Sequence, residues 1–316
     1  AGAATMMALS MALVGETIAK SNTGAAMGLL GTMSAIGTAL GPSLGGILIS
    51  TLGWQAIFLI QVPFGVFTFG LAYRSLKPGT VAKTAARFDF VGMLVLASTL
   101  LAYALAMTVG RGSFGLQNAI LLGAAAIGLA AFIRVEARAQ SPLLKLTVFR
   151  DAALNGALAA SLLVSAVMMT TLVVGPFYLS RGLGLNAAWI GLVIAIGPVV
   201  VALSGVPAGR LADRYGAGRI TAVGLSAMAI GSFLLAVMPI TMGVTGYAGA
   251  LVIITSGYAL FQTANNAGVM MDIPADRRGV ISGVLNLSRN IGLITGASVM
   301  AAIFAGASAA FEKGMT

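Results

Sequence analysis

Ten stretches of mainly apolar residues, most of them close to 20 residues long, constrain the fold of this chain more than any other feature. A helix of about 20 apolar residues crosses the hydrocarbon core of a bilayer. The stretches cover residues 1–15, 24–50, 54–72, 91–109, 118–133, 154–177, 188–206, 220–237, 247–263 and 281–306. Only 8% of the residues are charged, against about 25% in a soluble domain. The sequence therefore predicts an all-α polytopic membrane protein with ten transmembrane helices and excludes a soluble domain.

Basic residues are divided unequally between the two sides of these helices. Fourteen of the 18 Lys and Arg residues lie in alternate joints, and only Arg111, Arg181 and Lys313 lie in the others. Because cytoplasmic loops retain Lys and Arg, we expect residues 16–23, 73–90, 134–153, 207–219 and 264–280 to face the cytoplasm. The net charge of +10 is then explained by topology and not by nucleic-acid binding. We expect a multi-pass protein of the plasma membrane, which in bacteria is the inner membrane.

Several residue types needed for chemistry are missing. The sequence has no Cys and no His, which removes the usual metal ligands and the usual general base. It also has no phosphate-binding loop for a nucleotide. The eight Asp and Glu residues fall in loops or at helix ends, so none is clearly placed at mid-membrane. We expect no metal, no cofactor and no enzyme activity.

The second stretch carries glycines at four-residue spacing along one helix face. Gly24 and Gly28 begin this face, and the residues of interest further along are Gly37, Gly41, Pro42, Gly45 and Gly46. Small residues at this spacing let helix backbones pack closely, and Pro42 predicts a kink near residues 38–42. The stripe is typical of a tight helix crossing, or of a seal or hinge that controls access through a bundle.

A short basic turn joins the seventh and eighth stretches. Its notable residues are Gly209, Asp213, Arg214, Gly216 and Arg219. The Asp213 carboxylate is expected to meet the positive end of the eighth helix among the neighbouring Arg residues. The two glycines permit a tight turn. The turn either serves only topology, or it is a cytoplasmic gating loop.

Two motifs in these segments resemble one family. The pattern Gly-x-Leu-Ala-Asp-Arg-x-Gly of Gly209 to Gly216 resembles the cytoplasmic signature of the major facilitator superfamily. ALGPSLGG, from Ala39 to Gly46, resembles the fifth-helix signature of its antiporter branch. The sequences GWQAIFLIQVPFG and LNLSRNIG are similar to the fourteen-span drug:proton antiporters. The chain departs from the cytoplasmic signature at Ala217 and Gly218, where the family usually has basic residues.

The resemblance implies a division of the chain into three parts. Residues 1–73 correspond to family helices 4 to 6 of the N-terminal bundle, and residues 154–316 to helices 9 to 13 of the C-terminal bundle. Residues 74–153 comprise cytoplasmic linker segments and an inserted two-helix hairpin. On this mapping the chain is a fragment that lacks about three N-terminal spans and one C-terminal span.

Polar side chains within the apolar stretches are candidates to line a cavity. They are Gln61, Gln262, Asn286, Arg289 and Asn290. The amides are equally compatible with hydrogen bonds between helices. Arg289 lies in the tenth stretch, where a charge is costly. It either reaches back to the cytoplasmic interface or faces a central cavity as a gate or counter-ion.

The resemblance implies a secondary active transporter that exports drugs or other amphiphilic small molecules in exchange for protons. Its expected partners are a small-molecule substrate, protons and the lipid bilayer, and no nucleic acid. The proton carrier is then expected in the family's first helix. A solute importer of the same superfamily, or a membrane scaffold that transports nothing, remains an alternative.

Overall fold

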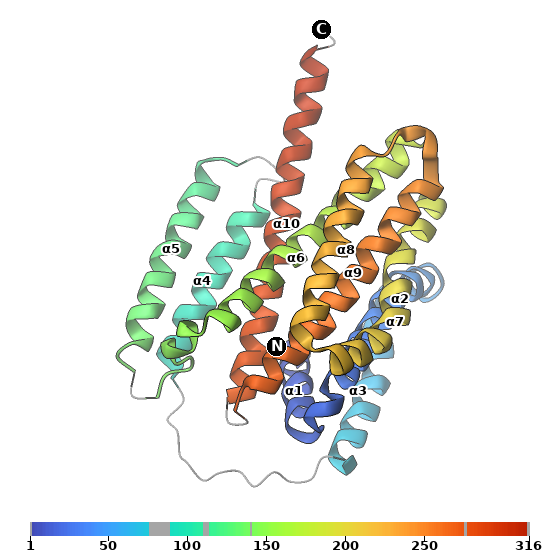
Figure 1. The fold of residues 1–316 in the computed structure, drawn as a ribbon. Helices are drawn as coiled ribbons and strands as arrows, with labels where there is room; N and C mark the ends of the chain where they lie inside the picture. The colour runs from blue at the N-terminus through green and yellow to red at the C-terminus, as the bar shows by residue number, and fades with distance from the viewer. Residues whose placement is uncertain (1, 76–88, 110–113, 140, 275–276, 315–316) are drawn as a thin grey trace.

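The computed structural model describes residues 2–75, 89–109, 114–139, 141–274 and 277–314, in which it contains ten α-helices and no strand (Figure 1). The helices are α1 (Gly2–Thr17), α2 (Thr23–Leu52), α3 (Gln55–Ser75), α4 (Phe90–Thr108), α5 (Leu116–Glu136), α6 (Ala152–Phe177), α7 (Ala187–Tyr215), α8 (Ala217–Val237), α9 (Gly243–Asp272) and α10 (Arg278–Gly314). Seven helices within the described residues are long and apolar enough to cross a membrane. The predicted all-α polytopic class, with one helix for each apolar stretch, is confirmed.

Four junctions between consecutive helices lie together at the lower end of the molecule in Figure 1. We call this end, which holds Thr17, Glu136, Tyr215 and Asp272, the basic end. The junctions are those between α1 and α2, α5 and α6, α7 and α8, and α9 and α10. Four of the five segments predicted to be cytoplasmic meet there, which agrees with the alternation of basic and non-basic joints in the sequence; most of the fifth, 73–90, lies outside the described residues.

Pairs of helices pack closely where glycines replace larger side chains. A Cβ atom on Gly224 of α8 would lie 2.7 Å from the carbonyl oxygen of Gly257 on α9. Gly292 and Gly296 of α10 are pressed in the same way against the backbone of α6 at Leu162 and Ala166. Small residues thus bring α8 against α9, and α10 against α6, in direct backbone contact.

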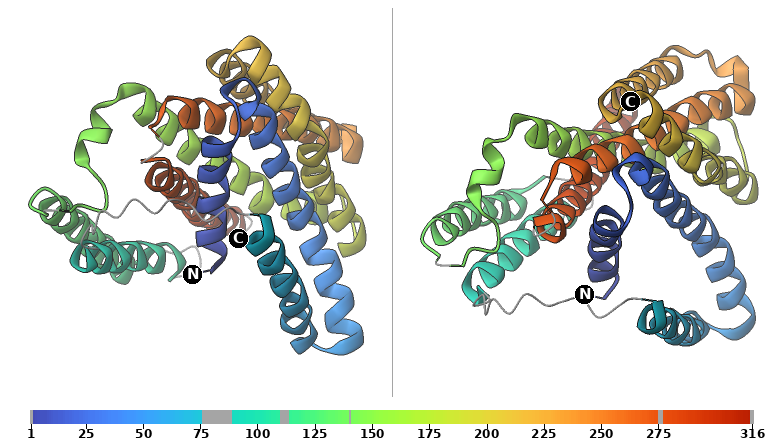
Figure 2. Two further views of the ribbon diagram at one scale, coloured as in Figure 1. Left: turned by 90° about the horizontal axis from the view of Figure 1, so that it is seen from below. Right: turned by 60° about the horizontal axis from the view of Figure 1, so that its bottom comes forward.

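The α4–α5 pair forms a hairpin on one side of the molecule (Figure 2). The amide of Asn118 on α5 is buried and donates to the carbonyl oxygen of Ala106 on α4 at 2.7 Å. The hairpin is attached to α10, where Ser298 donates to the carbonyl oxygen of Met107 at 2.6 Å and Thr295 bonds to Tyr103. Helices α4 and α5 therefore pack together and against a helix far along the sequence.

The joint between α7 and α8 is much shorter than predicted. The segment 207–219 was expected to be a loop, but α7 continues to Tyr215 and α8 begins at Ala217. Gly216 is the single residue between them, with a φ of 91°. This backbone conformation suits glycine, which has no Cβ. The residues of the predicted gating loop from Gly209 to Arg214 therefore form the last turns of α7.

Candidate transport site

Helices α2 and α7 pack against each other at the basic end through facing glycines. A Cβ atom on Gly24 would lie 2.5 Å from the carbonyl oxygen of Gly209. One turn further on, Gly28 and Gly205 meet even more closely, and the Thr32 hydroxyl donates to the carbonyl oxygen of Ala202 at 3.1 Å. The first part of the predicted glycine face is thus a close helix crossing, and its partner is α7.

Asp213 fastens the same crossing. Its Oδ1 accepts a hydrogen bond from the backbone amide of Gly24 at 2.7 Å, and its Oδ2 accepts one from Ala25 at 2.8 Å. The carboxylate therefore caps the N-terminus of α2, where free amides and the helix dipole favour a negative charge. The expectation that Asp213 would face the start of α8 was wrong, because α7 remains helical and turns this side chain toward α2.

The Arg residues of the turn point elsewhere. Arg210, Arg214 and Arg219 are exposed, and the Arg214 guanidinium lies over the Tyr215 ring at 5.2 Å from its centroid. The carboxylate at Asp213 is thus held by backbone amides of another helix, not surrounded by these Arg side chains.

The later part of the glycine stripe differs from the first. A Cβ atom on Gly37 would meet no atom within 4 Å, so the expected close packing does not occur there. The same spacing gives contact at Gly28, where α7 lies opposite, but at Gly37 no other helix of the described residues comes within 4 Å of the added Cβ. The surroundings of Gly41, Pro42, Gly45 and Gly46 lie outside the described residues, although α2 is assigned as a helix through Leu52.

Beyond this crossing the described residues line two adjoining, partly open cavities of about 330 and 340 Å³. Cavities of this size suit drug-sized ligands. The first lies nearer the basic end, since it takes Gly205 from α7, whereas the second takes Ile194 and Pro198. Both are lined by Gly31, Ser34, Val201, Tyr258, Gln262 and Arg289.

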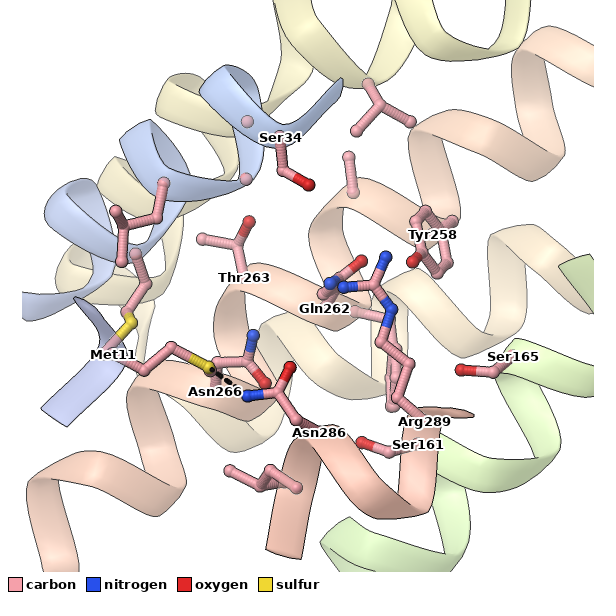
Figure 3. A pocket seen from close by; sticks show the side chains of 18 of the residues that line it. Met11, Ser34, Ser161, Ser165, Tyr258, Gln262, Thr263, Asn266, Asn286 and Arg289 are labelled. Carbon is pink, nitrogen blue, oxygen red and sulfur yellow. Dashed lines mark hydrogen bonds between the residues drawn. The ribbon is translucent and has the colours of Figure 1, made fainter. Parts of the chain in front are cut away.

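Arg289 lies where the two cavities meet. Figure 3 shows its guanidinium reaching from α10 to the side of Gln262 and toward Tyr258. Its Nε atom is buried and has no hydrogen-bond partner within the described part of the chain. Since α10 begins at Arg278, Arg289 is about 16 Å along the helix at 1.5 Å per residue. The side chain therefore faces the cavity, which is one of the two positions that the sequence allowed. It is the only formally charged residue among the described lining.

The other polar candidates are divided. Gln262 and Asn286 line the first cavity, where the Asn286 amide contacts the Met11 sulfur at 3.4 Å (Figure 3). Asn290 is exposed, lines neither cavity, and donates to the carbonyl oxygen of Asn286 at 2.8 Å. Gln61 is exposed on α3, which packs mainly against α2 at the edge of the molecule (Figure 2). The expectation that Asn290 and Gln61 line a cavity does not hold for these two cavities.

Some lining residues were not selected from the sequence. Ser161 and Ser165 of α6 are buried beside the first cavity, and Asn265 of α9 donates to the Ser161 hydroxyl at 3.0 Å. The four-residue spacing of the two serines within an apolar helix could have indicated a polar face in the sequence. Tyr258 carried no such signal, because one aromatic residue in an apolar stretch fits any position.

Ten apolar helices in the described residues, with cavities of mixed polarity among six of them and basic junctions at one end, define an integral membrane protein. The family model described as Major Facilitator Superfamily matches residues 1–297. The chain belongs to this superfamily and is a multi-pass inner-membrane protein.

Similar proteins carry transporter names. The uncharacterized transporter YebQ of Escherichia coli K12 is 30% identical over 302 residues, which cover 95% of this chain and 66% of YebQ. Multidrug resistance protein Stp of Mycobacterium tuberculosis is 30% identical over 96% of this chain and 57% of its own length. Riboflavin transporter RibZ of Clostridioides difficile is 26% identical over 96% of this chain and 66% of its own length. This chain thus spans between 57% and 66% of the length of these relatives.

Proposed function

We propose that this chain belongs to a fourteen-span antiporter, in which it supplies family helices 4 to 13, and that the antiporter exports drugs or other amphiphilic small molecules in exchange for protons. Three N-terminal spans and one C-terminal span would complete it. The incomplete coverage of the relatives supports this assignment, as does a relative named as a multidrug resistance protein.

The observation that carries the proposal is the closed crossing of α2 and α7 below two cavities. Glycine contacts and the Asp213 cap join a helix of the first group, α1–α3, to a helix of the later group, α6–α10. In alternating access, two bundles rock against each other around a central site. If the basic end is cytoplasmic, this arrangement is the state closed to the cytoplasm, and Asp213 is part of the gate.

The cavity chemistry supports an amphiphilic substrate. Its lining combines apolar side chains such as Met27 and Phe261 with hydroxyl and amide groups such as Ser34 and Gln262. Arg289 is the charge available to a substrate or to a counter-ion. Since the described lining contains no carboxylate, we place the proton carrier in the first family helix, before Ala1.

The direction and coupling of transport are tested with the complete gene product in inside-out membrane vesicles. An inside-acid pH gradient should drive accumulation of ethidium or riboflavin, and a protonophore should abolish it. Vesicles without the protein are the control. Uptake only in right-side-out vesicles would favour the importer, and no uptake of a wide panel of amphiphiles in either orientation would favour the scaffold.

A further inference from the structure

Two carboxylates meet at the basic end of the α4–α5 hairpin. Asp89 precedes α4 and caps it, its Oδ1 accepting a hydrogen bond from the amide of Gly92 at 2.7 Å. Glu136 is the last residue of α5, and its Oε2 accepts a hydrogen bond from the amide of Leu144 at 3.3 Å. In each acid, one carboxylate oxygen therefore accepts a hydrogen bond from a backbone amide, and the other oxygen is left for a second partner.

The second oxygens of the two acids lie beside the same point at Gly92. A Cβ atom on this glycine would lie 2.7 Å from Asp89 Oδ2 and 2.8 Å from Glu136 Oε1, so both oxygens border one point. Both atoms are buried, and neither has a hydrogen-bond partner among the described residues. The Glu136 side chain is only 4% exposed. Two carboxylates thus each bring a buried oxygen without a partner to the same point beside Gly92.

The charged side chains that flank this pair within the described residues are exposed. Arg134 and Arg138 flank Glu136 in the sequence and are exposed, as are Lys145, Arg150 and Asp151 on the segment leading to α6. Helix α4 itself contains no charged residue. Two ionised carboxylates so close together and shielded from water would repel each other and lose hydration.

One proton resolves this conflict. A carboxylate accepts hydrogen bonds only, whereas a protonated carboxyl also donates one. If one acid of the pair takes a proton from water, its hydroxyl donates to the facing oxygen of the other acid. The pair then carries one negative charge instead of two, and both previously unpartnered oxygens are satisfied by a single hydrogen bond.

We propose that Asp89 and Glu136 form a proton-binding site that holds one shared proton between them. The site lies where the hairpin is joined to the rest of the chain, because Glu136 also binds Leu144 on the segment leading to α6. Loss of the proton as the pH rises leaves two facing charges and loosens this attachment. The proposal does not depend on any transported substrate.

The shared proton is tested by infrared difference spectroscopy of the complete gene product at neutral pH, in H₂O and in D₂O. Glu136→Gln and Asp89→Asn each place an amide donor opposite the remaining carboxylate, so no proton is needed. Both variants should lose the same protonated-carboxyl band that the parent shows. Asp151→Asn is the matched control, since Asp151 also caps a helix but is exposed, and its carboxylate accepts from the amides of Ala153 and Leu154. It should keep the band.

Thermal unfolding between pH 5.5 and 8.5 provides a second readout. The parent and Asp151→Asn should lose roughly 2–4 °C more than Glu136→Gln as the pH rises, because only they lose the shared proton. A band that one of the two variants retains would assign the proton to a single acid and overturn the proposal. Lower stability of Glu136→Gln by the same amount at every pH would also overturn it, since a base would then neutralise Glu136.

Discussion

Asp213, near the end of α7, accepts a hydrogen bond of 2.7 Å from the backbone amide of Gly24, at the start of α2 and 189 residues earlier in the chain. Together with the bond from Ala25, it places a carboxylate at the positive end of α2. A charge at a helix end is easily separated from its partner when two helix groups move apart. Such a contact is therefore better suited to a gate that opens and closes than to a part of the core that stays packed.

Asp213→Asn should lower transport several-fold without preventing membrane insertion. The amide keeps one oxygen to accept from α2 but loses the charge and the second acceptor, a loss of about 1–2 kcal/mol at a helix N-terminus. Transport in vesicles and the amount of protein in the membrane are the two measurements. Asp151→Asn, at the exposed start of α6, should transport like the parent. Normal transport by Asp213→Asn would contradict a gating role and would mean that the turn between α7 and α8 serves only membrane topology.

Gly28→Val should separate α2 from α7, and Gly37→Val should not. The new side chain at Gly28 would overlap the backbone of Gly205, whereas a Cβ on Gly37 meets nothing within 4 Å. Overpacking of this kind costs about 1–3 kcal/mol. We expect reduced transport and a lower unfolding temperature for Gly28→Val alone. Equal damage from both substitutions would show that the stripe acts through another surface.

Arg289→Gln should lower transport while leaving the protein as stable as the parent or more so. The substitution removes a charge whose Nε is buried without a partner in the described structure, and an arginine at the centre of a membrane helix costs at least about 2.5 kcal/mol. Transport kinetics and thermal unfolding are measured together. Asn290→Gln is the control one residue away, and we expect parental behaviour from it. A large loss of stability in Arg289→Gln would mean that the guanidinium is a structural partner.

Cysteine labelling should place the basic end in the cytoplasm. The sequence contains no Cys, so single cysteines can be introduced at exposed positions such as Arg219, beside Gly216, and Ser180, beyond α6. An impermeant maleimide should label Ser180→Cys in intact cells and Arg219→Cys only after the cells are opened. The reverse pattern would invert the topology and the assignment of the closed state.

The number of helices and the alternation of their junctions could be predicted from the sequence because each depends on local properties. A stretch of apolar residues long enough to cross a bilayer forms a helix wherever it lies, since its backbone can bond internally. The basic residues between stretches then fix which junctions share a side. Even so, the expected loop 207–219 was wrong, because Gly216 alone suffices for the turn.

The partners of individual residues were decided only by the tertiary structure. Gly28 and Gly37 lie in one stripe of glycines, yet only Gly28 has a helix opposite it. From the sequence, Arg289 could lie at the membrane interface or in the cavity. The structure decides between them, because it shows where α10 begins and that Arg289 lines the cavity. Asp89 and Glu136 are 47 positions apart in the sequence and meet only because the hairpin folds back on itself. Hydrophobic burial in a membrane depends on composition and can be calculated from a short window of sequence. A hydrogen bond or a helix contact depends on which distant residue arrives at the same point, and that is a property of the whole fold.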